Sequence, residues 1–207
     1  MSKVYVALIA DATASRTLAP ERRARLQRAL RAAIPEFNRR WRKARAARFA
    51  VTLGDEFQAL LTTADPVWEI GHETRFRFPE VEWVIACGRG PIATRLERQT
   101  SAPEVDGPCF HAARAALEAA KRHRLLFTFG GFDPALTAFA QYYSALYWSW
   151  TSRQRRAATL LRLGTPAFAA AQLKVDRSAV SHLSRRMAWP LVEGGDKMFR
   201  AALGEAL

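Results

Sequence analysis

The fold is decided by the stretch Val4-Tyr5-Val6-Ala7-Leu8-Ile9-Ala10, which Asp11 follows directly. This run is continuously apolar and contains β-branched residues, a pattern typical of a strand that is covered on both faces. A polar stretch from Asp11 to Ala19 comes next and is expected to be a loop. We therefore predict a central strand of a sheet here, with Asp11 at its end.

A long helix is predicted after this loop, beginning at Pro20. Its apolar side chains recur at spacings of three and four residues and so share one face. Pro35 interrupts the pattern and predicts a kink or a break into two helices. The apolar face consists of Leu26, Leu30, Ile34, Phe37 and Trp41.

The remaining strands and helices follow from turn residues and apolar runs. Residues 48–53 and 56–61 flank Gly54-Asp55, a signal typical of a β-hairpin. Asp65-Pro66 predicts the N-cap and first turn of a helix that ends near Pro79. Further strands are expected at 81–87 and 124–129, and a further helix at 108–123. This β-α-β-β-α-β order favours an α+β fold, a ferredoxin-like (palm-type) antiparallel sandwich, over a doubly wound parallel sheet.

Composition limits the classes of function. The 207 residues are 49% hydrophobic and 25% charged, with 32 Lys and Arg against 19 acidic residues, a net charge of +13. This excess of cations points to polyanions such as nucleic acid or nucleotides. The longest apolar run is far shorter than the roughly 20 residues of a membrane helix. With no signal peptide and only Cys87 and Cys109, without metal-type spacing, we expect free thiols, a cytoplasmic location and no membrane partner.

A domain boundary is expected near residue 150, giving domains 1–150 and 151–207. Asp133-Pro134 predicts a helix that carries an aromatic segment ending at Trp150. Such a segment is able to stack nucleobases, but packing against a sheet or a second domain is the favoured interpretation. Residues 151–207 contain ten cations and four acidic residues.

This C-terminal segment has a helix-turn-helix pattern. Residues 166–172 predict a short helix, 173–175 a tight turn, and Asp176 the cap of a second helix. Residues 170–181 resemble the helix-turn-helix of bacterial regulators, and an ordinary αα-hairpin is the alternative. Residues 189–195 fit either a small wing or the end of the domain. In the DNA-binding interpretation, base edges are contacted by Arg177, Ser178, Ser181 and His182, and phosphates by Lys174 and Arg185.

Two aspartates predict a metal site in the N-terminal domain. Asp11 ends the first strand and Asp55 lies at the hairpin tip, and a ferredoxin-like order places these two elements side by side. Two carboxylates at one end of a sheet suit Mg²⁺ or Mn²⁺. In the alternative interpretation, Asp11 is a turn or cap residue and Asp55 only helps to form the hairpin.

Three motifs, taken together, resemble the SatD family of bacterial proteins. They are Asp11-Ala-Thr-Ala-Ser-Arg16, Leu53-Gly-Asp-Glu-Phe-Gln58 and Asp106-Gly-Pro-Cys-Phe-His-Ala-Ala-Arg114. The resemblance extends over nearly the whole chain and implies a C-terminal helix-turn-helix. It implies no defined reaction.

The N-terminal domain also resembles, more distantly, the palm-type domains of class III nucleotidyl cyclases and GGDEF proteins. The resemblance implies that Asp11 and Asp55 bind the metal. It further implies a phosphate or nucleotide at five positions: Ser15, Arg16, Gly54, Gly107 and Arg114. Phe110 stands where the cyclase Asn-x-Ala-Ala-Arg pattern has Asn, and Val51 and Thr52 stand where a purine-recognising Lys is usual. These differences argue against catalysis more than against nucleotide binding, and we assign no catalytic residue.

Three functions remain open. The first is a DNA-binding regulator whose N-terminal domain binds a nucleotide or phosphate ligand with a divalent cation. The second is a metal-dependent enzyme of nucleotidyl or phosphoryl transfer. The third is a degenerate palm domain used only for dimerisation. In each case we expect a homodimer formed through the N-terminal domains, because helix-turn-helix proteins usually bind paired half-sites and the resembled cyclase sites are shared between subunits.

Overall fold

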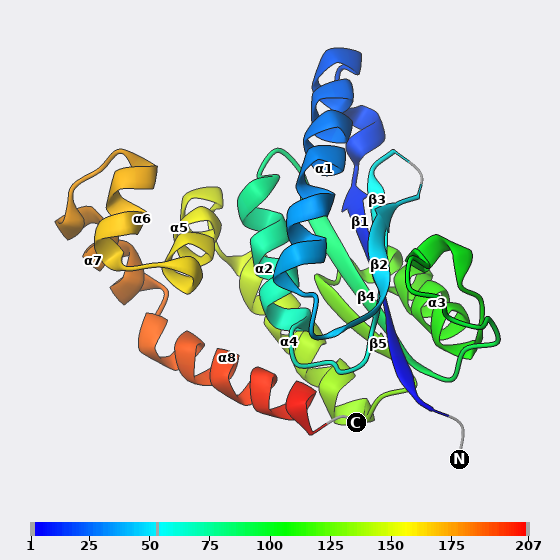
Figure 1. Cartoon of the computed structure of the whole chain (residues 1–207). Helices are drawn as coiled ribbons and strands as arrows, with labels where there is room; N and C mark the ends of the chain where they lie inside the picture. Colours follow the sequence, from blue (N-terminus) through cyan, green and yellow to red (C-terminus); the bar gives the residue numbers. More distant parts are fainter. Residues whose placement is uncertain (1–2, 53, 206–207) are drawn as a thin grey trace.

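The sheet has five strands in the order β2-β3-β1-β4-β5, so the strand predicted as central is central (Figure 1). The computed structural model describes residues 3–52 and 54–205; Leu53, the expected last residue of the first hairpin strand, lies outside them. The strands are β1 (Tyr5–Thr13), β2 (Arg45–Val51), β3 (Glu56–Leu61), β4 (Glu82–Gly90) and β5 (Phe127–Gly130).

The pairing of the strands confirms the predicted α+β fold. β1 is antiparallel to both β3 and β4, and β2 is antiparallel to β3. These four strands form the ferredoxin-like arrangement, to which β5 adds a parallel edge next to β4.

Helices cover both faces of the sheet, which explains the continuous apolar run of β1. One face packs against α1 (Pro20–Arg40) and α2 (Val67–Arg77), and the other packs against α3 (Pro108–His123). Val6 and Leu8 point into the first layer, whereas Ala7 and Ile9 point into the second. Every residue of the run from Val6 to Ala10 is therefore buried.

Five more helices follow β5, and their side chains complete the main core. Phe199 lies with its ring centroid 4.6 Å from that of Trp68, and Ala157 and Leu203 belong to the same buried cluster. The predicted domain boundary near residue 150 falls at the short link between α4 and α5, and helices on both sides of it share this core. The helices are α4 (Pro134–Ser149), α5 (Ser152–Leu163), α6 (Pro166–Leu173), α7 (Arg177–Arg186) and α8 (Trp189–Gly204).

The aromatic segment of α4 packs, as predicted. Tyr143, Tyr147 and Trp150 are buried, and only Tyr142 is largely exposed, at 72%. Asp133 caps the helix through its side chain, which accepts a hydrogen bond from the backbone of Ala135. The aromatic density therefore serves the core.

Some predicted details of the elements are wrong. Residues 189–195 form neither a wing nor an end: they are the first half of α8, whose buried Val192, Phe199 and Leu203 offset the roughly 1 kcal/mol that each helical glycine costs. The first strand continues past Ala10 because the backbone pairing with β4 extends to Thr13 opposite Glu82.

Two further details differ from the predictions. α1 does not break into two helices at Pro35, and in its last turn the Asn38 side chain hydrogen-bonds both backbone groups of Phe49. The N-cap of α2 is Pro66, not Asp65, whose carboxylate instead accepts a hydrogen bond from Thr63.

The two cysteines are free, as expected, and both are buried. Burial raises the pKa of the Cys109 thiol to about 11 and raises the pKa of Cys87 as well. Both thiols are protonated at neutral pH and are therefore poor nucleophiles. In the part of the chain that the structure describes, no helix has the length and apolarity to cross a membrane.

Candidate functional site

A cavity of about 760 Å³ lies at the end of β1. Its walls are the end of β1, the short 3₁₀ turn Ser15–Thr17, the start of β4, the C-terminal end of α3, and residues of α4 and α5. Four of the residues predicted from the sequence line it: Asp11, Ser15, Arg16 and Asp55. The structure therefore brings both expected metal ligands and two of the five expected phosphate contacts to one place.

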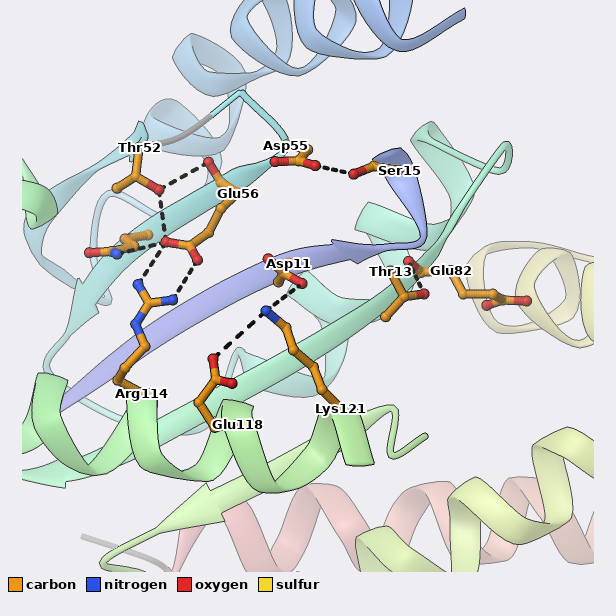
Figure 2. Close-up of polar contacts among 11 residues, drawn as sticks. Asp11, Thr13, Ser15, Thr52, Asp55, Glu56, Glu82, Arg114, Glu118 and Lys121 are labelled. Carbon is orange, nitrogen blue, oxygen red and sulfur yellow. Dashed lines mark hydrogen bonds and ion pairs between the residues drawn. The ribbon is translucent and has the colours of Figure 1, made fainter. Parts of the chain in front are cut away.

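Asp11 lies inside β1 rather than at its end, and it points to the α3 side of the sheet (Figure 2). This direction follows from the alternation that also points Ala7 and Ile9 toward α3. The Lys121 ammonium of α3 lies 3.3 Å from Asp11 Oδ2. Burial raises the pKa of Asp11, Lys121 opposes this, and the nearby carboxylates of Glu56 and Asp55 raise the pKa further.

Asp55 reaches the cavity because the hairpin tip is held against β1. The Ala12 amide donates to the Asp55 carbonyl oxygen at 3.2 Å, and the Ser15 hydroxyl donates to the Asp55 carboxylate (Figure 2). Gly54 next to it has φ +54°, and a Cβ there would lie 2.6 Å from Gln27 Nε2. Gly54 therefore lets the tip approach α1, and it does not itself line the cavity.

Glu56, which sequence reasoning missed, lies directly opposite Asp11 in the pairing of β1 with β3. Its carboxylate accepts two hydrogen bonds from the Arg114 guanidinium, at 2.7 and 2.9 Å, and others from Thr52 and Gln58. Burial alone would raise the pKa of Glu56, but these donors, Arg114 first, lower it. Arg114 is thus paired with a carboxylate of its own chain and does not line the cavity.

Gly107 lies far from the predicted residues that line the cavity. It precedes α3, near Gly90, which pairs with Tyr5 at the start of β1. Lys121 is fourteen residues further along this helix, a rise of roughly 21 Å. Gly107 has φ +149°, and a Cβ there would lie 2.6 Å from Ile92 Cα. The close approach of Ile92 therefore explains why a glycine stands at this position.

The donor set is suited to a hard divalent cation. Within residues 3–52 and 54–205, no three His, Cys, Asp or Glu side chains are grouped to hold a metal ion on their own. Mg²⁺ commonly takes only one or two carboxylates and completes its shell with water and phosphate oxygens. Asp11 and Asp55 line one cavity, and Asp55 is close enough to raise the pKa of Asp11, so the two fit such a shared site.

Three cations and one aromatic residue of the cavity wall were not predicted. Lys121 and Arg124 come from the end of α3, Trp148 from α4, and Arg155 from α5. In the sequence each cation is one among 32, and no motif marks it. The packing of α3 on β1, β4 and β5 brings Lys121 and Arg124 to the cavity, the packing of α4 on β5 brings Trp148, and Arg155 comes with α5, which packs against α2.

The family model of the SatD family matches residues 5–124. The chain belongs to the SatD family. No curated protein matches it. Among solved structures, the guanylyl cyclase Cya2 is similar, at 14% identity over 64% of this chain and 75% of that one, with a TM-score of 0.39. A bacterial light-regulated adenylyl cyclase is similar at 16% identity over 62% of this chain and 43% of that one, with a TM-score of 0.37.

The family match ends at Arg124, so α6 and α7 of this SatD-family chain lie outside it. They form two helices joined by a tight turn in which Lys174 adopts the left-handed conformation, with φ +53°. Ala170 and Val180 are buried between α5, α6 and α7, and the partly buried Phe168 packs against them. Leu183 of α7 is partly buried and packs against the main core.

All six residues predicted to contact DNA are exposed. Lys174 lies in the turn, and Arg177, Ser178, Ser181, His182 and Arg185 follow on α7. Asp176 occupies the N-cap position of α7 but makes no capping hydrogen bond through its side chain. Figure 1 shows α6 and α7 at one side of the molecule, away from the sheet. This face is therefore free to approach a large partner.

Proposed function

We propose that this SatD-family protein binds a phosphate-bearing ligand, with a nucleotide as the first candidate, together with Mg²⁺ or Mn²⁺ in the cavity at the end of β1. One observation carries the proposal: the cavity combines the two carboxylates Asp11 and Asp55 with the cations Arg16 and Lys121. Carboxylates suit the cation and guanidinium groups suit phosphate, so the cavity offers donors for both halves of a metal–phosphate ligand.

Each residue has a part in this proposal. Asp11 and Asp55 hold the cation, which would neutralise phosphate charge when bound. Arg16 is exposed at the rim and donates to phosphate oxygens. Ser15 orients Asp55 through its hydroxyl.

Binding is favoured over transfer chemistry by the position of Phe110. Its ring is only 8% exposed and packs in the core between α3 and the sheet. The side chain that stands in place of the cyclase Asn is thus a packing residue. A nucleotidyl or phosphoryl transfer enzyme is the second candidate for the cavity, and a palm domain used only for dimerisation is the third.

The test is the melting temperature of the full chain with adenosine and guanosine nucleotides, each with and without Mg²⁺ or Mn²⁺. We expect nucleotide and cation together to raise it, because a ligand that binds only the folded state stabilises that state. Asp11→Asn/Asp55→Asn should abolish the shift. The matched control, Glu21→Gln/Glu193→Gln, changes the charge equally at two exposed positions and should keep it. An equal shift in the Asn variant would contradict the metal site.

We also propose that α6 and α7 bind duplex DNA. The observation in favour is that all six predicted contacts are exposed on a compact three-helix unit. Because phosphate contacts release counterions, affinity should fall with salt at a log–log slope of about −0.9 per phosphate contacted. Lys174→Gln should flatten this slope by about one, and Arg177→Ala should cost about 1–3 kcal/mol and relax the preference at one base pair.

The controls for DNA binding use the full chain, because α8 completes the main core. Arg186→Gln changes an exposed arginine of α7 that is not among the predicted contacts, and it should have little effect. If Arg42→Gln/Lys43→Gln weakens binding and Arg177→Ala does not, the basic turn between α1 and β2 is the binding surface instead.

A homodimer formed through the N-terminal domains is part of this proposal. A dimer would present two copies of α7 to paired half-sites. Light scattering at low micromolar concentration should give about twice the 23.2 kDa chain mass. A monomer at every concentration would contradict it.

A further inference from the structure

The cavity extends well beyond the aspartates. Across the sheet, the order β3-β1-β4-β5 separates the hairpin tip with Asp55 from the β5 side by three strand spacings, roughly 14 Å. Asp55 and Ser15 line the cavity on the β3 side. Arg124 precedes β5 and lines it on the other side, with Trp148 and Arg155 beside it. The cavity therefore has two distinct ends.

Arg124 and Arg155 at the second end are held in place, as is Lys121, which lies between the two ends beside Asp11. The Arg124 guanidinium lies 4.2 Å from the centre of the Trp148 ring, and the Trp148 Nε1–H donates to the Arg124 carbonyl oxygen at 2.7 Å. Arg155 donates to the Trp150 carbonyl oxygen at 3.1 Å and lies 3.7 Å from Glu82. Lys121 is held by Asp11 and, more loosely, by Glu118. Fixed cations lose less conformational entropy when they bind an anion.

Glu80 and Glu82 also line the cavity, but Glu82 already accepts a hydrogen bond from Tyr147 and lies near Arg155, so the free guanidinium at this end favours an anion over a nucleobase. Guanidinium groups lie over the Trp148 ring from both Arg124 and Arg155, the latter at 5.0 Å, so stacking positions on that ring are already used. Arg124 has no carboxylate partner in the described part of the chain. Its N–H donors are therefore available to phosphate oxygens, for which a guanidinium fork is well shaped.

We propose that Lys121, Arg124 and Arg155 form a second anion subsite, so that the ligand carries two separated phosphate groups, as a dinucleotide does and a mononucleotide does not. The first phosphate group lies with the cation at Asp11 and Asp55, and this part rests on the proposed function. The second lies on the three cations. Arg155 of this subsite and the neighbouring Trp148 come after the residues that the family model matches. The subsite therefore uses residues from inside and outside the matched range.

The decisive variant is Arg124→Gln, because Arg124 is exposed and its loss leaves the core intact. Titration calorimetry in 0.15 M NaCl would compare adenosine 5′-monophosphate with the 5′-phosphorylated dinucleotide pApA, both with Mg²⁺. We expect wild type to bind the dinucleotide at least tenfold more tightly, and Arg124→Gln to remove this advantage while changing monophosphate affinity less than twofold. Arg124→Lys should keep most of it. The matched control is Arg122→Gln, an exposed neighbour outside the cavity.

A second titration, with inorganic pyrophosphate in EDTA, tests the subsite without the metal. Here Arg124→Gln should raise the dissociation constant about tenfold, whereas Asp55→Asn should not raise it. If pyrophosphate binds wild type and Arg124→Gln equally, or does not bind, the subsite is wrong even where Mg²⁺-dependent nucleotide binding persists. If pyrophosphate binding depends on Arg124 but no nucleotide responds to Mg²⁺, the proposed metal site fails and the subsite stands.

Discussion

Two ion pairs in this protein have the same charges and opposite surroundings. Arg162 of α5 and Asp196 of α8 form a two-point pair, at 2.6 and 2.9 Å, with side chains only 2% and 5% exposed. Lys121 and Asp11 form a single contact at 3.3 Å beside the cavity, with side chains 40% and 16% exposed. The first pair lies among packed aromatic rings and the second faces open space.

The difference shows which pair can exchange its partner. A buried pair is held by the cost of leaving either charge alone in a medium of low polarity. Arg162 and Asp196 therefore join α5 to α8 permanently. An accessible pair is worth about 0–1 kcal/mol, so a divalent cation or a phosphate is able to replace one partner at little cost. The pair at the cavity is thus suited to binding, and the buried pair to structure.

The largest effect is expected from breaking the buried pair. Asp196→Ala leaves the Arg162 guanidinium buried without its carboxylate and should lower the free energy of unfolding by about 3–5 kcal/mol. Urea unfolding of the full chain measures this. The double variant Arg162→Met/Asp196→Leu removes both charges and should recover most of the loss. A loss below about 1 kcal/mol for Asp196→Ala would show that the pair is not a structural link.

A smaller effect is expected at Glu56, whose partner Arg114 is half-exposed. Arg114→Met should cost about 1–3 kcal/mol at pH 7, because Thr52 and Gln58 still donate to the buried carboxylate. The pKa of Glu56 is lowered, so its stabilisation is present above 4.5, the ordinary value, and is lost as pH falls through the lower folded-state pKa. The difference between wild type and variant should therefore shrink below pH 4.5.

This pH dependence is measured by urea unfolding between pH 3 and pH 7. Arg122→Met, on an exposed position of the same helix, is the control and should change the free energy of unfolding by less than about 0.5 kcal/mol. A difference for Arg114→Met that stays constant over the whole pH range would show that Glu56 is not its cause.

Asp11→Asn should instead increase the free energy of unfolding. Burial raises the pKa of Asp11, so the ionised carboxylate destabilises the folded protein as pH rises above 3.8, its ordinary value. We expect the Asn variant to gain about 0.5–1 kcal/mol at pH 7 without ligand and to lose the metal-dependent shift. The gain should disappear on acidification. A destabilised variant would mean that the pair with Lys121 outweighs the burial of Asp11.

The smallest effect is expected at Glu118. Its carboxylate is 60% exposed and lies 3.9 Å from the Lys121 ammonium. Glu118→Gln should change the free energy of unfolding by less than about 0.5 kcal/mol. In the pyrophosphate titration, Glu118→Gln should change the dissociation constant less than twofold. This result would distinguish the loose contact of Lys121 with Glu118 from its contact with Asp11.

Helices and strands that are decided by residues close together in the chain were predicted well. The bounds of α3 follow from Pro108 at its first turn and from the cations of its last turn, and the hairpin follows from Gly54-Asp55. The burial of β1 on both faces follows from its unbroken apolar run. In each case the residues that decide the structure are neighbours in the chain.

The sequence alone therefore determined the α+β order of the elements, the central position of β1, and the approach of Asp11 and Asp55 to one place. Tertiary structure alone decided that β1 continues to Thr13, that residues 189–195 are helical, and that Gly107 lies far from the cavity. It also decided that Lys121, Arg124 and Arg155 meet at one cavity. The physical reason is the same throughout: propensity and turn chemistry act over a few residues, whereas pairing across a sheet and packing between helices join residues that no local pattern connects.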